Sequence, residues 1–201
     1  VQNKIPLILF FLLLLSSLIF YFKVDFLVLK LLFVSLIMTF SFYALKSLNH
    51  RRRPVFDVTL WYWKFSLSAL GLSMIIWLFN IFESNYILAI VFAFGFLYSL
   101  LQGMAYKIIP FLSWFHLNSK GYFKLPTIRE FIEERYIKLH FFFHILSLVF
   151  FVAAYFVNSF IYMASFLFLV SNIIFFINIL TAIRKYSKIA NTDPMDLSSF
   201  K

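Results

Sequence analysis

Long apolar runs alternate with short polar connections along this chain. Each run is close to the roughly 20 residues that a helix needs to cross about 30 Å of hydrocarbon. The runs cover residues 5–22, 26–45, 58–80, 86–110, 139–157 and 159–183. This pattern predicts an all-α fold, a polytopic integral membrane bundle of about six transmembrane helices.

The connections between these runs differ in length on the two sides of the predicted bundle. The two longer connections, 46–57 and 111–138, lie on the same side as both termini. The three short connections on the opposite side are Lys23 to Asp25, Glu83 to Asn85, and Asn158 to Ser159. Because such short connections join antiparallel neighbours, we expect the helices to pair as three antiparallel hairpins.

The second long connection carries its own helical pattern. Pro110 is expected to end the preceding helix, because proline interrupts the backbone hydrogen-bond ladder. Farther on, Thr127 as an N-cap and Glu130 three residues later form a capping-box pattern. The apolar residues that follow this start at helical spacing are Ile128, Phe131, Ile132 and Tyr136. We therefore expect an amphipathic interfacial helix over 126–138 that continues or kinks into the helix at 139–157.

Composition excludes a water-soluble fold. Apolar residues make up 63% of the 201 residues and charged residues 13%, whereas globular proteins average about 45–50% and about 25%. A soluble enzyme, a DNA-binding domain and a disulfide-linked secreted module are therefore excluded. The absence of cysteine also excludes thiolate chemistry, thiolate metal sites and disulfides.

The charge distribution predicts the orientation in the membrane. Of the 18 Lys and Arg residues, all except Lys23 and Lys30 lie on or near the side of the two termini. Basic residues concentrate on the cytoplasmic side of membrane proteins, so we place both termini in the cytoplasm. The expected environment is the inner (plasma) membrane, with the lipid bilayer as the main partner and no nucleic acid. The residues expected to contact anionic lipid headgroups are Arg51, Arg52, Arg53 and Lys107.

The two ends of the sequence suggest further partners. The chain starts at Val1 without an initiator methionine and enters its first apolar run by Ile5. We therefore expect a fragment or processed piece of a longer membrane protein, which would contact the missing N-terminal helices or another membrane subunit. Residues 184–201 are polar and are expected to form a cytoplasmic tail.

One predicted helix carries an unusual line of polar residues. At about 100° per residue, one face of 139–157 and of the turn before it collects Glu133, His140, His144 and Ser147. Lipid does not accommodate such a line, and intramembrane ionisable groups are functional candidates. Three interpretations stay open: a metal or haem site at His140 and His144, a proton or ion relay, or histidines that only join helices.

The helix at 86–110 carries small residues every four positions. Gly95, Ser99 and Gly103 form the small-xxx-small pattern that lets helix backbones approach closely, so we expect a helix-packing face. Lys107 follows on the same helix. Its ammonium group is expected either to reach the cytoplasmic headgroups or to meet a buried partner such as Glu133.

Motifs of the common enzyme classes do not occur in the sequence. It contains no Walker A loop, G-x-G-x-x-G, G-x-S-x-G or H-E-x-x-H. The sequence also has no clear internal repeat, so it does not support an inverted-repeat transporter. Motifs therefore assign no catalytic residue.

A family resemblance is carried by Gly103 to His116, which read GMAYKIIPFLSWFH, with Pro126-Thr127 and the region of Arg135. The segment resembles the G-M-x-Y-K-I-x-P-F-L-x-W-x-H segment of bacterial polytopic membrane proteins that are similar to subunit I of haem-copper oxidases. The resemblance implies a haem-copper-oxidase-like helical scaffold, with this chain as the C-terminal half of a longer protein.

The resemblance also implies haem or copper as candidate cofactors. In this half, oxidase subunit I has adjacent histidine metal ligands and an H-x-H pair of haem ligands, and neither pattern occurs here. Oxygen reduction and proton pumping are therefore not carried over. The residues that remain candidate haem or metal ligands are His116, His140 and His144.

Two functional hypotheses follow from the sequence. The first is a redox-associated or metal-associated membrane protein with His140 and His144 at its site. The second is a non-enzymatic membrane transport or assembly component that uses the polar line. Bound haem or copper would favour the first hypothesis, and metal-independent flux would favour the second.

Overall fold

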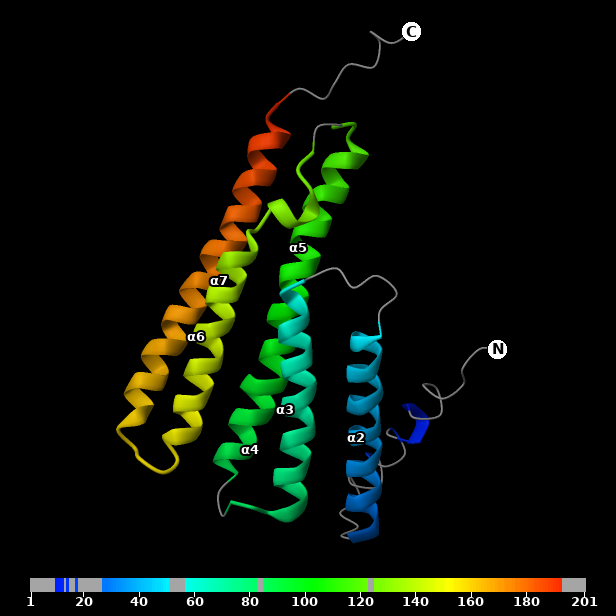
Figure 1. The fold of residues 1–201 in the computed structure, drawn as a ribbon, viewed down its shortest axis with the longest axis vertical. Coiled ribbons are helices and arrows are strands. Elements are labelled where there is room, and N and C mark those ends of the chain that lie inside the picture. Colours follow the sequence, from blue (N-terminus) through cyan, green and yellow to red (C-terminus); the bar gives the residue numbers. More distant parts are fainter. Residues whose placement is uncertain are drawn as a thin grey trace. The chain divides into compact units, whose positions relative to one another are not determined.

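The part of the chain that the structure describes is built from helices. The computed structural model describes residues 10–12, 14, 17, 27–50, 57–82, 85–122 and 125–192. In chain order the elements are α2 (Leu27–Asn49), α3 (Thr59–Phe79), α4 (Tyr86–Ile90), η1 (Val91–Tyr98), α5 (Ser99–Ser119), η2 (Ile128–Glu130), α6 (Glu134–Ala153) and α7 (Phe160–Ala190) (Figure 1). The predicted all-α class is confirmed.

Five helical segments within these ranges are long and apolar enough to cross a membrane. Four are the single helices α2, α3, α6 and α7, and the fifth is the continuous stretch of α4, η1 and α5 from Tyr86 to Ser119. These segments match the last five predicted runs and have the character of a multi-pass membrane protein. The first predicted run, 5–22, lies mostly outside the described residues.

The boundary predicted at Pro110 is wrong. Helix α5 passes through this proline and continues to Ser119. Leu117, on the continuation, is completely buried in an apolar cluster. Burial of a leucine side chain contributes about 1.5–3 kcal/mol, which is comparable to the usual cost of about 3 kcal/mol for a proline inside a helix.

The predicted helix over 126–138 is also corrected. The segment forms only the short 3₁₀ turn η2, and α6 starts at Glu134. The backbone amide of Thr127 donates a hydrogen bond to Oε2 of Glu130 at 3.0 Å, so part of the capping pattern is present. The break after η2 lets the consecutive residues Phe131 and Ile132 both be buried, whereas an interfacial helix would direct them about 100° apart.

A glycine ends α5. Gly121 has a φ of 84°, a left-handed conformation that glycine adopts without a steric penalty. Its amide donates to the carbonyl of Asn118 at 3.1 Å, and the amide of Tyr122 donates to that of Leu117 at 3.3 Å. These bonds satisfy carbonyl groups at the helix end and reverse the chain.

The chain divides into two compact units. The first contains residues 1–55 and 64–98. Its described core joins Val34 of α2 with Leu70 and Met74 of α3. Phe33 packs edge-on against Trp77, with ring centroids 6.1 Å apart.

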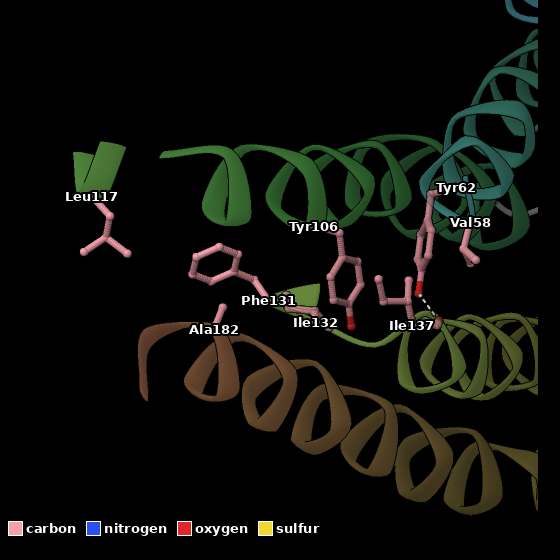
Figure 2. Packing of buried hydrophobic residues seen from close by; sticks show 8 residues of the cluster. All are labelled: Val58, Tyr62, Tyr106, Leu117, Phe131, Ile132, Ile137 and Ala182. Atoms are coloured by element: carbon pink, nitrogen blue, oxygen red, sulfur yellow. Dashed lines mark hydrogen bonds between the residues drawn. The ribbon is translucent and has the colours of Figure 1, made fainter. Parts of the chain in front are cut away.

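The second unit contains residues 56–63 and 99–201. Here α6 and α7 form an antiparallel hairpin, and α5 and the start of α3 belong to the same unit (Figure 1). Figure 2 shows its apolar cluster, which contains Val58, Tyr62, Tyr106, Leu117, Phe131, Ile132, Ile137 and Ala182.

The buried face of α6 combines polar with apolar residues. The buried residues of α6 are Ile137, His140, His144, Ser147 and Leu148, at the spacing of one helical face. Large apolar side chains such as Phe142, Tyr162 and Phe166 are instead exposed, by 61%, 80% and 61%. In a membrane these side chains suit contact with lipid, whereas polar side chains require partners inside the protein.

Candidate functional site

The candidate site centres on His140, whose side chain is completely buried in the second unit. Three polar side chains from two other helices lie within hydrogen-bonding distance of its ring. The hydroxyl oxygens of Tyr62 and Tyr106 lie 2.6 Å and 3.0 Å from Nδ1, and Nε2 of Gln102 lies 3.3 Å from Nε2 of the histidine. Both ring nitrogens therefore have hydrogen-bonding neighbours.

Asn178 on α7 extends this arrangement to a fourth helix. Its side-chain amide donates to the hydroxyl of Tyr106 at 2.9 Å and to the carbonyl of Tyr136 at 3.3 Å. We call Tyr62, Gln102, Tyr106, His140 and Asn178 the His140 cluster. It connects α3, α5, α6 and α7 in the second unit.

Helical spacing explains how α5 supplies two members of the cluster. Gln102 and Tyr106 are four residues apart and therefore share one face. Gly103 lies beside them, and a Cβ atom there would be only 2.8 Å from Cβ of Tyr62 and 2.8 Å from Cδ1 of Trp63. The missing side chain of Gly103 thus lets α5 approach the start of α3 closely enough for Tyr62 to contact His140.

His144 forms the next polar contact along α6. Its Nε2 lies 2.7 Å from Oγ of Ser99. Ser147 donates from Oγ to the carbonyl of His144 at 2.7 Å. The rings of His140 and His144 have centroids 6.2 Å apart, so the two buried histidines form consecutive parts of one polar region.

The hydrogen bonds around His140 support both neutral tautomers. With the proton on Nδ1, the ring donates to the oxygen of Tyr62, whose own O–H donates to the carbonyl of Ile137 at 3.3 Å (Figure 2). With the proton on Nε2, Nδ1 accepts from Tyr106, because Asn178 already donates to the Tyr106 oxygen. Neither tautomer leaves Nδ1 without a suitable neighbour.

The side chain of Gln102 can hydrogen-bond to either neutral tautomer of His140. It is 1% exposed, and its Oε1 atom has no hydrogen-bond partner among the described residues. Rotating the amide by half a turn would direct Oε1 at Nε2 of His140 and accept that proton, because the two ends of an amide have nearly the same shape. The orientation of Gln102 and the tautomer of His140 are therefore coupled.

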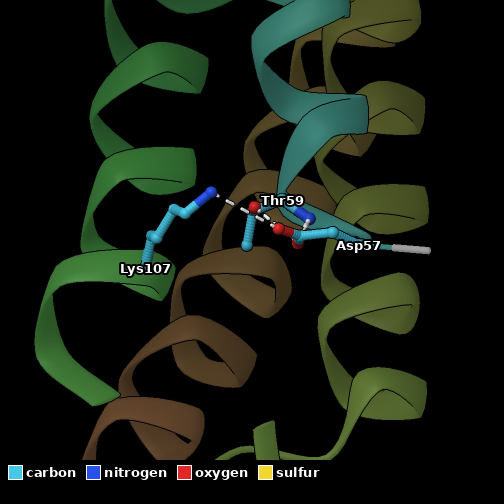
Figure 3. Close-up of polar contacts among 3 residues, drawn as sticks. All are labelled: Asp57, Thr59 and Lys107. Atoms are coloured by element: carbon cyan, nitrogen blue, oxygen red, sulfur yellow. Dashed lines mark hydrogen bonds and ion pairs between the residues drawn. The ribbon is translucent and has the colours of Figure 1, made fainter. Parts of the chain in front are cut away.

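An ion pair lies at the start of α3 in the same unit. Oδ1 of Asp57 accepts hydrogen bonds from the backbone amide of Thr59 at 2.9 Å and from its hydroxyl at 2.6 Å. Nζ of Lys107 is 3.5 Å from Oδ2 of Asp57 (Figure 3) and 4.8 Å from the centre of the Trp63 ring. Burial alone raises the pKa of Asp57, but the bonds from Thr59 and the charge of Lys107 outweigh burial and hold the pKa below its ordinary value.

Glu133 and Lys107 do not belong to the His140 cluster. Glu133 precedes α6 with an extended backbone, so a helical projection does not apply to it. Its carboxylate is 2.6 Å from Nε of Arg135, and both side chains are exposed. Lys107 pairs with Asp57 rather than with Glu133.

The third candidate metal ligand also lies elsewhere. His116 is exposed near the end of α5, where its Nδ1 is 2.6 Å from the hydroxyl of Tyr186. Gly95 is buried within η1 and belongs to the first unit, whereas Ser99 and Gly103 belong to the second. The predicted headgroup contacts Arg51, Arg52 and Arg53 lie outside the described residues.

The described residues do not by themselves form a metal centre with three side-chain ligands. They contain no group of three His, Asp or Glu side chains close enough to hold one ion. Polar side chains lie within hydrogen-bonding distance of both ring nitrogens of His140 and of Nε2 of His144. Ligation at these nitrogens would break these contacts.

Sequence reasoning missed the tyrosines of the cluster. Tyr62 and Tyr106 counted as apolar residues in membrane-spanning runs, although a buried tyrosine hydroxyl requires a hydrogen-bond partner. Tyr106, Gln102 and Ser99 share helical spacing on the polar side of their helix, which was the available signal. The partners on other helices depend on tertiary packing.

Comparison with known proteins does not assign the chain to a family. No protein-family model matches it, and no match was found among curated proteins or solved structures. The His140 cluster is therefore the feature of the chain that bears on its function.

Proposed function

We propose that this chain is a transport component of the bacterial inner membrane whose His140 cluster relays protons. In this proposal both termini lie in the cytoplasm, as the distribution of Lys and Arg favours. The function is non-enzymatic, and the polar line on α6 serves as part of the path.

The connected hydrogen bonds around His140 are the observation that carries the proposal. Buried histidine in a membrane-spanning helix is costly and marks proton relays and ion pathways. A histidine that only joined two helices would need one partner, whereas His140 has neighbours at both nitrogens and from two helices. Both tautomers are supported, so a proton can arrive at one nitrogen while another leaves from the opposite one.

This geometry favours a relay over the haem or copper role that the family resemblance implies. The rings of His140 and His144 are close, but contacts with Tyr62, Gln102, Tyr106 and Ser99 already occupy both ring nitrogens of His140 and Nε2 of His144. Absorbance in the Soret region and metal analysis of the purified protein provide the direct comparison. A haem or copper signal that disappears in His140→Gln would support the cofactor role instead.

Proton flux into liposomes tests the relay. The purified chain is reconstituted with a trapped pH-sensitive dye, and a potassium diffusion potential drives proton entry. We expect flux above that of protein-free liposomes and a decrease of about 10-fold or more in His140→Gln, which removes the group that carries the proton. His116→Gln is the matched control, because His116 lies outside the cluster and is exposed.

The control variant makes the outcome decisive. Flux that falls in His140→Gln but persists in His116→Gln supports the relay, provided that both variants elute as the same species on size exclusion. Equal flux in the wild type and in His140→Gln would overturn the proposal. An identical decrease in both variants would also contradict it, because it would show no special role for the buried histidine.

A further inference from the structure

A cavity in the second unit approaches the His140 cluster. It has a volume of about 220 Å³ and is lined by residues of η2 and of α5 and α6, and by the segment that starts α3. Its charged lining residues are Asp57, Lys107, Arg129 and Glu134. This volume is enough for several water molecules, at about 30 Å³ each in the liquid.

Tyr106 belongs to both the cavity and the cluster. It lines the cavity, it is 3% exposed, and its hydroxyl is 3.0 Å from Nδ1 of His140. Among the described residues that line the cavity, it is the one whose side chain hydrogen-bonds to His140. One tyrosine therefore connects the lining of a charged cavity with a completely buried histidine.

The charges around the cavity balance. Asp57 is paired with Lys107, and its lowered pKa keeps it ionised at neutral pH. Arg129 and Glu134 supply one further positive and one further negative group from η2 and α6. Such a lining attracts water without imposing a strong field of one sign on an entering proton.

We infer that this cavity is a water-filled vestibule through which protons reach the His140 cluster, with Tyr106 as the connecting side chain. The inference rests on the proposed relay and adds its aqueous entrance. A proton from cavity water binds the oxygen of Tyr106 while the hydroxyl proton of Tyr106 passes to Nδ1 of His140. Tyr106 is neutral again after this step, and the positive charge resides on His140.

The neighbours of His140 suit this step. Asn178 donates to the oxygen of Tyr106 and so directs the Tyr106 proton at the histidine. Once both nitrogens of His140 carry protons, the unpartnered Oε1 of Gln102 can accept from Nε2 after rotation of its amide. The cluster thereby offers an acceptor to the charged ring without any large movement.

Cysteine accessibility tests the vestibule without measuring transport. The chain has no cysteine, so single substitutions report one position each. We expect Glu134→Cys and Ile137→Cys, at the cavity, to react with a charged, membrane-impermeant methanethiosulfonate that is added to one side of the liposome membrane. Phe142→Cys is the control, because this exposed residue of α6 lies outside the cavity lining and should face lipid.

The labelling results separate a wet cavity from a dry one. Reaction at residues 134 and 137, with none at residue 142, supports the vestibule. Reaction at residue 134 alone, in folded protein, would overturn it, because water would then not reach the level of Tyr106. Such a result would leave a His140-dependent flux, and hence the relay itself, unaffected.

Substitutions at the cavity test its connection to the relay. Tyr106→Phe removes the connecting hydroxyl and should lower proton flux about 10-fold, whereas Tyr162→Phe, on the exposed face of α7, should not. Arg129→Gln should raise flux and Glu134→Gln should lower it, each by about two- to fourfold, the size expected for one charge acting through a hydrated region. Unchanged flux in Tyr106→Phe would overturn the inference even where His140→Gln abolishes flux.

Discussion

Gly103 sets the distance between α5 and the start of α3. A Cβ atom at this position would lie 2.8 Å from Cβ of Tyr62 and 2.9 Å from Nε1 of Trp63. We expect Gly103→Ala to destabilise the protein by roughly 1–3 kcal/mol, because the backbone near Tyr62 must move. This effect exceeds the roughly 0.5–1 kcal/mol that alanine usually gains over glycine within a helix.

Gly71→Ala provides the control for Gly103→Ala. Gly71 also lies within a helix, but a Cβ atom there would meet only the end of the Met38 side chain, with Sδ at 3.4 Å and Cε at 4.0 Å, which are ordinary contacts. Thermal denaturation in detergent should therefore show a lower midpoint for Gly103→Ala and an unchanged or higher midpoint for Gly71→Ala. Equal midpoints in both variants would contradict the close approach at Gly103.

The ionised form of Asp57 stabilises the fold, with a defined pH dependence. Its pKa in the folded protein is below the ordinary value, so its contribution is complete above an unfolded pKa of about 3.9. The contribution disappears as the pH falls through the lower folded pKa. Asp57→Asn keeps an N-cap oxygen for Thr59 and removes the charge that pairs with Lys107.

The expected loss in Asp57→Asn is about 1 kcal/mol or less at pH 7, because Lys107 is 46% exposed and solvent screens the pair. Chemical denaturation of both proteins between pH 3 and pH 7 measures this difference. The two stabilities should converge towards the acidic end. A difference that grows as the pH falls would show that Asp57 is not stabilised in its ionised form.

The polar residues of α6 show which parts of the candidate site can be predicted from single positions in the sequence. His140, His144 and Ser147 stand out in an apolar run because lipid offers them no partner, and all three are buried. Their partners could not be predicted, since Tyr62 and Asn178 are distant in sequence and reach His140 and Tyr106 only through tertiary packing. Glu133 was misplaced because the helical projection was extended beyond the true start of α6 at Glu134.

At the scale of elements, the apolar runs predicted the helices and missed the details at their ends. The positions of five runs follow from length and hydropathy alone, and the structure has a long helical segment at each. The helix end predicted at Pro110 was wrong because it considered only local backbone chemistry. Burial of Leu117 keeps α5 helical to Ser119. Long-range contacts of this kind leave no periodic signal in the sequence.

The connection before α6 shows the same competition. Its spacing of apolar residues fits a helix, but Phe131 and Ile132 are both buried in the cluster of the second unit (Figure 2). Burial of two consecutive large side chains favours the observed break over a continuous amphipathic helix. The break also places Arg129 and Glu134 at the same cavity, an arrangement that the predicted helix did not suggest.

For the whole molecule, orientation in the membrane is the property that the sequence predicts and that a direct measurement can decide. Residue 118 lies near the end of α5, and residue 158 lies in the connection between α6 and α7. Both are exposed asparagines in the second unit. They precede and follow α6, whose 20 residues span about 30 Å, so the two positions should lie on opposite sides of the membrane.

Single cysteines at these two positions form a matched pair, because the natural chain contains no cysteine. With cytoplasmic termini, a membrane-impermeant maleimide should label Asn158→Cys in spheroplasts and Asn118→Cys only after the membrane is opened. The excess of basic residues near the termini and long connections favours this orientation. The reverse labelling pattern would invert the orientation and place the cavity entrance on the outer side, and labelling of both positions in spheroplasts would show that α6 does not span the membrane.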